Sequence, residues 1–216
     1  MLQWARSADN FAAPLSGQWV RRNGLTNPLT SGGMVTTNTS SGLYPAEFIA
    51  RRTSTADQYV AVTLAQLHPG TSGGSASCLF LRSPNNAASG TVPVAFIKNA
   101  QIGIFTMTSW AAGGLAPRAP YADVNGGANI PLGSRIEFYV INNVYYVACN
   151  GVVVINPWVD SANIASQTGR YGGLIMQYAS DGSASGAMGF DDFVFGDYRP
   201  VEVPTPMQSM NRSASF

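Results

Sequence analysis

The stretch that decides the fold runs from Ile136 to Ile155 and reads IEFYVI, NN, VYYVAC, NG, VVVI. Every second residue from Ile136 to Val140 is apolar and its neighbours are more polar, which is the period of a half-buried strand. Asn tolerates a positive φ, so Asn142-Asn143 fits a two-residue hairpin, and Asn150-Gly151 is the strongest short hairpin signal. The stretch therefore predicts three antiparallel strands in consecutive order.

Strand-like runs recur along the rest of the chain, and no window carries the apolar stripe of an amphipathic helix. Roughly ten to thirteen short strands predict an all-β fold, an antiparallel β-sandwich. Outside the hairpins, the expected strands are Trp19–Arg22, Phe48–Arg51, Asp57–Leu64, Ser77–Arg82, Val94–Lys98, Ile102–Thr108, Gly173–Tyr178 and the run around Phe193 and Phe195. Long segments rich in small residues predict loops at Gly24–Met34, His68–Ser77, Ser83–Val92, Ala111–Gly133 and Asp181–Ala187.

Charged residues are scarce: they make up 11% of the 216 residues, the net charge is +1, and 45% of the residues are hydrophobic. Such a chain has no broad basic field for nucleic acid. Arg21-Arg22 and Arg51-Arg52 place only one cation per strand face, which favours ion pairs or subunit contacts. The N-terminus lacks the apolar stretch of a signal peptide, and no run is long enough for a membrane helix.

The pattern of strands and prolines divides the chain into three parts. Residues 1–8 are expected to be a lead-in, residues 9–198 a single β-sandwich domain, and residues 199–216 an extended arm. The arm contains Pro200, Pro204 and Pro206, which remove backbone donors and prevent sustained sheet pairing. We expect such an arm to be disordered in a monomer and to lie on a neighbouring subunit in an assembly.

The residues needed for common catalytic sites are few, so we expect no enzymatic activity. The three glutamates are Glu47, Glu137 and Glu202, and none has a second carboxylate at the spacing of a paired-carboxylate glycosidase. Asp191 and Asp192 are adjacent, and adjacent strand residues are expected to face opposite sides. His68, the only histidine, lies in a turn signature without a nucleophile motif.

No cofactor or metal is expected. Asp123, Asn125, Asp160 and Asp181 offer oxygen ligands of the kind that calcium prefers. The twelfth position of a calcium loop that starts at Asp123 would, however, be Ser134 instead of an acid. Asx-turns and hairpin caps explain these residues better. Cys78 and Cys149 lie in apolar runs, which favours buried thiols, although a disulfide between them remains an alternative.

Three motifs resemble those of concanavalin A-like (laminin G-like) jelly rolls. They are Asp9-Asn10-Phe11 followed by Gly17-Gln18-Trp19, the Asn-Gly hairpin with a following Asp in Tyr145–Asp160, and GFDDFVFGD at Gly189–Asp197. The resemblance implies that the first strand returns beside the last one. The chain looks closest to the glycine- and alanine-rich versions found in tail and other virion proteins of phages that infect actinobacteria. Its single lysine, Lys98, among many arginines agrees with a GC-rich coding sequence.

The resemblance implies a structural virion protein, most simply a minor tail protein that assembles with other virion subunits or copies of itself and contacts host glycans. It would be assembled in the host cytoplasm and located in the virion. A capsid decoration protein and a free carbohydrate-binding module or lectin are the alternatives. No nucleic-acid or membrane partner is expected. The assembly contacts would come from the arm, through Pro200, Pro204, Pro206, Arg212 and Phe216.

Sugar binding would use an exposed aromatic ring for stacking and amide or carboxylate groups for the hydroxyls. The candidates are Trp110, which ends a strand, and Tyr121, Asp123 and Asn125, which lie in the longest expected loop. Each of the two rings could equally fill a core edge or a subunit interface. Trp19 and Trp158 are expected to lie in the core.

Overall fold

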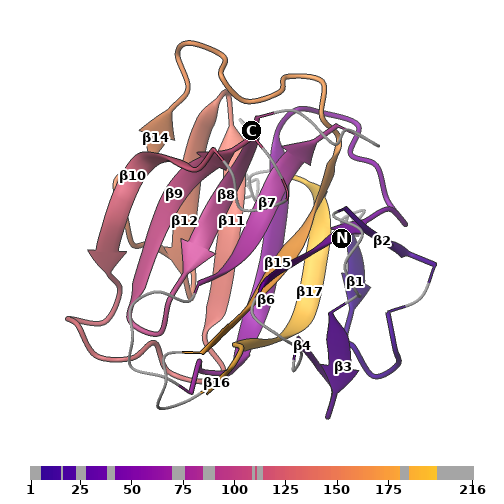
Figure 1. The fold of residues 1–216 in the computed structure, drawn as a ribbon. Helices are drawn as coiled ribbons and strands as arrows, with labels where there is room; N and C mark the ends of the chain where they lie inside the picture. Colours follow the sequence, from indigo (N-terminus) through magenta and orange to yellow (C-terminus); the bar gives the residue numbers. More distant parts are fainter. Residues whose placement is uncertain are drawn as a thin grey trace, which may run out of the picture.

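The computed structural model describes residues 6–15, 17–22, 28–37, 42–69, 76–84, 91–108, 110, 114–180 and 185–198. Within these residues every regular element is a β-strand, and no helix is long and apolar enough to cross a membrane. The strands form two antiparallel sheets that pack face to face (Figure 1). The expected antiparallel β-sandwich is confirmed.

Sheet A has the order β13-β12-β11-β6-β17-β4-β3, with β1 also paired to β17 and β14 paired to β12. Its strands are β1 (Arg6–Asp9), β3 (Leu29–Ser31), β4 (Met34–Thr36), β6 (Gln58–Gln66), β11 (Arg135–Ile141), β12 (Val144–Cys149), β13 (Val152–Val153), β14 (Trp158–Val159) and β17 (Gly189–Asp197).

Sheet B has the order β10-β9-β8-β7-β15-β5-β2, with β16 paired to β15. Its strands are β2 (Trp19–Arg21), β5 (Gly42–Phe48), β7 (Ser77–Ser83), β8 (Val92–Ile97), β9 (Gln101–Met107), β10 (Ala116–Asp123), β15 (Tyr171–Ser180) and β16 (Ser185–Gly186).

The two Asn-containing turns join β11, β12 and β13 in consecutive order, as the sequence predicts. Asn142 and Asn143 have φ of 48° and 63°, and Asn150 and Gly151 have φ of 52° and 79°. Two successive positive φ values match the right-handed twist of a hairpin. The third strand is shorter than expected, because β13 ends at Val153.

The first strand lies beside the last one, as the resemblance implies (Figure 1). Strands β1 and β17 are antiparallel, with Arg6 opposite Gly196 and Asp9 opposite Phe193. Strand β1 begins at Arg6, so it extends into the segment that was expected to be a lead-in.

Several expectations about strand positions were wrong. The segments expected as loops at Gly24–Met34 and Asp181–Ala187 contain the short strands β3 and β16. A strand was expected at Phe48–Arg51, but the strand in this region is β5, which covers Gly42–Phe48 and ends where the expected one would begin. The loop expected at Ala111–Gly133 contains β10, whose prolines Pro117 and Pro120 hid it from the sequence pattern. Proline is tolerated there because β10 is an edge strand, and its register shifts twice against β9.

The main core fills the space between the two sheets. Trp19 lies in it as expected, and its indole contacts Phe48 and Phe193 edge-on at centroid distances of 4.9 Å and 4.7 Å. Trp158 is half-buried at the rim of this core and stacks on Tyr145 at 4.7 Å. The two predictions of core positions therefore hold, fully for Trp19 and partly for Trp158.

Sheet B is also buried on its outer face. In β7, Leu79 and Leu81 belong to the main core, whereas Cys78 and Phe80 belong to a second apolar cluster. We call this second set the outer cluster, and its members are Ala76, Cys78, Phe80, Val92, Val94, Phe96, Met107, Trp110 and Ile175, with Phe105 and Tyr121 packed against them. Burial on both faces explains why β7 is a continuous apolar run instead of an alternating one.

Candidate functional site

Trp110, the first candidate for sugar stacking, belongs to the outer cluster. Its side chain is 6% exposed and packs edge-on against Phe80, with ring centroids 5.0 Å apart. An indole buried in this way has no free face for a sugar ring. Of the two roles left open for Trp110, a binding platform or the filling of a core edge, this burial favours the core edge.

Tyr121 lies at the accessible rim of the outer cluster, on β10 and not in a loop as expected. It is half-buried, and its ring contacts the half-buried Phe105 of β9 at 5.2 Å. The Nζ atom of Lys98 stands 4.0 Å from the Tyr121 ring centroid. Burial is the main cause that raises the pKa of the Tyr121 hydroxyl, which stays protonated as a hydrogen-bond donor.

Polar groups surround these two rings. Asp123 is exposed at the end of β10 and accepts a hydrogen bond from Gln101 Nε2 at 2.9 Å. Burial also lowers the pKa of Lys98. We call Lys98, Gln101, Phe105, Tyr121 and Asp123 the β9–β10 surface. It combines apolar rings with a cation, an amide and a carboxylate.

Asn125, the fourth candidate, lies in the turn that follows β10. Its Nδ2 donates to the backbone oxygen of Asn129 at 3.1 Å, so the side chain stabilises its own turn. The structure thus brings together Tyr121 and Asp123 but assigns different roles to Trp110 and Asn125. Lys98, Gln101 and Phe105 were missed because their place beside Tyr121 follows from the β9–β10 pairing, which the sequence did not reveal.

A second candidate is a hollow of about 640 Å³ between β4, β16 and the end of β15. Its lining includes Thr30, Ser31 and Tyr178. Two further polar side chains of the lining form hydrogen bonds within the protein: Thr36 Oγ1 donates to Met188 O, and Gln66 Nε2 donates to Ala187 O. We call this the β4–β16 hollow.

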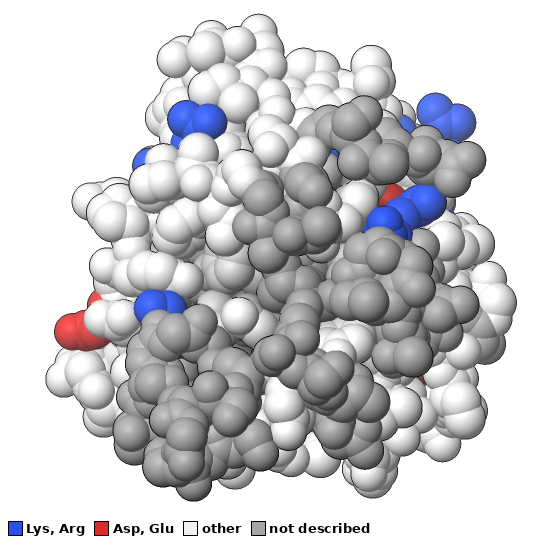
Figure 2. Space-filling view, viewed as in Figure 1, with Lys and Arg blue, Asp and Glu red and all other residues white. Residues whose placement is uncertain are grey.

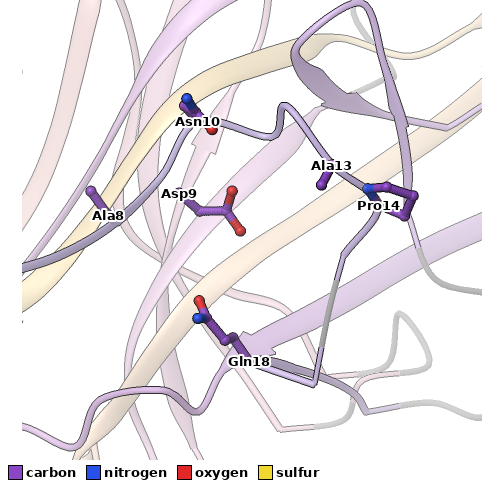
Figure 3. A pocket seen from close by; sticks show the side chains of 6 residues that line it. All are labelled: Ala8, Asp9, Asn10, Ala13, Pro14 and Gln18. Carbon is purple, nitrogen blue, oxygen red and sulfur yellow. The ribbon is translucent and has the colours of Figure 1, made fainter.

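A third, smaller pocket lies beside the N-terminal strand and is lined by Ala8, Asp9, Asn10, Ala13, Pro14 and Gln18. Figure 3 shows the Asp9 carboxylate in this pocket. Both Asp9 oxygens have structural partners, because Oδ1 accepts from Phe11 N and Oδ2 accepts from Trp19 Nε1, each at 2.8 Å. The motif from Asp9 to Trp19 therefore has a structural role: the Asp9 carboxylate links the first strand to the core tryptophan through a hydrogen bond.

The two described glutamates belong to different sheets, each on the side of its sheet that faces away from the main core. Glu47 is fully buried in sheet B and forms an ion pair with Arg22. Glu137 is in sheet A, where its Oε1 accepts a hydrogen bond from the Tyr59 hydroxyl at 2.6 Å. In each strand the neighbouring residues point into the main core, so the two carboxylates face away from each other. They cannot act as a pair across one substrate.

The expectation that Asp191 and Asp192 face opposite sides was wrong. Phe190 and Phe193 both lie in the main core, so the two acids between them lie on the outer side of a bulge. Asp192 has a φ of 48°, as such an irregular strand position requires. Its Oδ2 accepts a hydrogen bond from Thr63 Oγ1 at 3.2 Å.

The described candidate calcium ligands form hydrogen bonds with neighbouring protein groups instead of gathering around one point. Asp160 is 2% exposed, and its two oxygens accept hydrogen bonds from Ile164 N and Ala165 N at 2.8 Å and 2.9 Å. This is the capping role expected of it. Among the described residues there is no group of three or more His, Cys, Asp or Glu side chains that could hold a metal ion. Asp181 lies outside these residues.

The two cysteines, His68 and Arg51 are each buried or engaged in contacts within the fold. Cys78 and Cys149 are free buried thiols, as favoured, and they lie in different clusters. His68 is buried, and its backbone exchanges two hydrogen bonds of 2.9 Å with the Asn99 side chain. Arg51 contacts Asp197 at 3.9 Å. Together with the Arg22 pair, this contact agrees with the expected ion pairing.

Charged side chains occur as small separate groups on the face shown in Figure 2. Among the described residues on this face there is no continuous basic track for a phosphate backbone, in line with the low charge of the sequence. The arm contacts expected at Pro200, Pro204, Pro206, Arg212 and Phe216 lie outside the described residues.

No protein-family model and no curated protein matches the chain. Solved structures do match. Lectin II from Ulex europaeus superposes with a TM-score of 0.59 at 9% identity, over 88% of this chain and 97% of that one. The chain has the jelly-roll fold of lectins. The carbohydrate recognition domain of Emp47p gives 0.58 at 10% identity over 90% and 95% of the two chains. A native glycosidic hydrolase gives 0.55 at 12% identity over 88% and 94%.

Proposed function

We propose that this chain is a non-catalytic carbohydrate-binding domain that serves as a structural part of a phage virion, as a minor tail protein that contacts host glycans. The observation that carries the binding proposal is the β9–β10 surface. Tyr121 and Phe105 offer apolar rings, while Gln101, Asp123 and Lys98 offer hydrogen-bond groups around them. This is the composition that a sugar requires, with an apolar ring face and a rim of hydroxyls.

The lectin-type fold supports the same proposal, because one of the similar structures is a lectin and another is a carbohydrate recognition domain. The glycosidic hydrolase is the enzymatic alternative. The divergent orientation of Glu47 and Glu137 favours binding without hydrolysis, since a glycosidase needs two carboxyl groups about 5–10 Å apart.

The binding test starts from an array of oligosaccharides and purified bacterial surface polysaccharides, followed by calorimetric titration of the strongest binder. Tyr121→Ala should weaken binding at least about tenfold, because an aromatic contact contributes on the order of 1.4 kcal/mol. Val152→Ala, a change at a strongly exposed residue on β13, is the matched control and should leave affinity unchanged.

Tyr178→Ala tests the β4–β16 hollow in the same titration. If Tyr178→Ala abolishes binding and Tyr121→Ala does not, the β9–β10 surface is not the binding site. If the wild-type chain binds no carbohydrate at millimolar concentration, the carbohydrate proposal fails altogether. Release of reducing sugar from a bound polysaccharide would overturn the non-catalytic part.

The virion part of the proposal is supported by the sequence: few charges, one lysine, abundant Gly and a proline-containing arm suit a subunit covered by neighbours. Mass spectrometry of purified particles should find the chain, and immunogold labelling should place it on the tail. Labelling of the capsid would instead support a decoration protein. A monomer absent from particles that still binds sugar would support a free lectin.

A further inference from the structure

A row of tyrosine rings crosses the outer face of sheet A. Tyr139 of β11 stacks on Tyr146 of β12 with centroids 5.1 Å apart and planes 11° from parallel. On its other side Tyr139 stacks on Tyr198 at 4.9 Å and 14°. We call Tyr146, Tyr139 and Tyr198 the tyrosine ladder.

The ladder is separate from the main core and from the β9–β10 surface. Ile136, Phe138 and Val140 fill the core from β11, so Tyr139 faces the opposite side of the strand. All three ladder rings are half-buried, and their centroid spacing near 5 Å is that of offset stacks. Each ring therefore covers only part of its neighbour, and all three residues keep part of their surface exposed.

The hydroxyl of Tyr139 can act as a hydrogen-bond donor. Burial, followed by the neighbouring Tyr198, Glu137 and Tyr146, raises the pKa of Tyr139, so its hydroxyl keeps its proton at neutral pH. A surface that combines rings with hydroxyl donors suits a polyproline II segment. Such a segment has apolar proline rings and backbone carbonyls without internal hydrogen-bond partners.

The sequence supplies such a segment next to the ladder. Tyr198 is both the last described residue before the arm and one end of the ladder, and Pro200, Pro204 and Pro206 follow it within eight residues. At ~3.1 Å per residue, residues 199–206 span about 25 Å in the polyproline II conformation. This length is ample to pass Tyr139 and Tyr146. The direct connection also gives a high effective concentration.

We propose that the tyrosine ladder is the docking surface for the proline-containing segment 199–206 of the same chain. The arm would then cover the outer face of sheet A when no neighbouring subunit competes for it. In an assembly the same surface is the place where arms can be exchanged between copies.

The test uses the full chain with Ser209→Cys carrying a nitroxide label, because Cys78 and Cys149 are buried and react poorly. Ring-proton NMR signals of Tyr139 and Tyr146 should broaden in the paramagnetic sample. Those of Tyr121, which lies on the outer face of sheet B, should not. Replacing Pro200, Pro204 and Pro206 by Ser in the labelled chain should abolish the broadening.

A mixed sample identifies the occupant. Nitroxide-labelled protein at natural isotope abundance is combined with isotope-labelled protein that carries no nitroxide. Intramolecular docking predicts no broadening in this mixture. Broadening there would show that the arm of a second copy occupies the ladder, which overturns the intramolecular proposal. Equal signals for Tyr139 and Tyr121 in the singly labelled chain would show that the arm does not dock on the ladder.

Discussion

Trp110 packs against Phe80 in the outer cluster, and its burial makes it a determinant of stability. Trp110→Ala should lower the free energy of unfolding by about 3–5 kcal/mol, since removing a buried indole leaves a cavity. Urea denaturation checks this value. Leu132→Ala is the control: Leu132 is 59% exposed, and its loss should change stability by less than about 0.5 kcal/mol. Unchanged stability of Trp110→Ala together with lost sugar binding would restore Trp110 as a binding residue.

Asp197 is the carboxylate with a depressed pKa at the end of β17. Burial alone would raise its pKa, but hydrogen bonds from Thr55 and Ser54 outweigh burial and lower it. Its Oδ1 accepts from Ser54 N, Thr55 N and Thr55 Oγ1 at 2.8 Å, 2.9 Å and 3.1 Å. These bonds tie the last strand to the segment that enters β6.

A lower pKa in the folded state stabilises the fold above the ordinary pKa of Asp, and this contribution is lost as the pH falls through the folded value. Asp197→Asn should therefore be less stable than wild type at pH 7, and the difference should shrink below about pH 4. Thermal unfolding between pH 7 and pH 2.5 measures both curves. A constant difference across this range would contradict the prediction.

At the scale of elements, the hairpin between β12 and β13 depends on Gly151, whose φ is 79°. Gly151→Ala should destabilise the protein by about 1 kcal/mol, because a Cβ disfavours this conformation. Gly17→Ala is the matched control, since Gly17 does not have a positive φ and an added Cβ would meet nothing within 4 Å. Chemical denaturation of both variants tests the difference. An equal effect of both substitutions would contradict the hairpin geometry.

The elements that the sequence predicted are those defined by neighbouring residues. The turns at Asn142-Asn143 and Asn150-Gly151 specify their own φ values, so the order β11-β12-β13 could be predicted. Strand β10 could not, because it is an edge strand whose prolines break the pattern and whose register shifts against β9. The β9–β10 surface depends on that pairing. This is why Tyr121 and Asp123 were identified but Lys98, Gln101 and Phe105 were not.

The burial of sheet B on both faces could not be predicted from the local sequence pattern either. The apolar run of β7 reads as a buried strand, but only the packing divides Leu79 from Phe80 between two clusters. The tyrosine ladder had a partial signal, because alternation from Ile136 to Val140 already places Tyr139 on the outer side. The contribution of Tyr198 required the tertiary structure.

At the scale of the whole molecule, β1 pairs with β17 and covers an edge of this strand in sheet A. Deleting residues 1–8 should reduce stability on the order of 2 kcal/mol and produce concentration-dependent association. The cause is that residues Val194–Gly196 lose their β1 partners and become an open strand edge. Light scattering after gel filtration and thermal unfolding measure the two effects.

Deletion of residues 1–5, which precede β1, is the control and should behave as wild type. If the longer deletion remains monomeric and as stable as the control, β1 does not protect this edge. The low charge of the chain makes this protection important, because only an 11% share of charged residues is available to prevent edge-to-edge pairing.

The antiparallel pairing of Arg6 with Gly196 means that the polypeptide enters and leaves the described fold at neighbouring points. A domain with adjacent termini tolerates circular permutation and insertion into a surface loop of another protein. Strand β2 at one edge of sheet B lies near these ends, because its Trp19 packs against Phe193 of β17. Strand β10 forms the other edge of sheet B, far from β2 (Figure 1). Grafted by its ends, the domain would stand as a side branch with Tyr121 and Asp123 on its outward-facing margin.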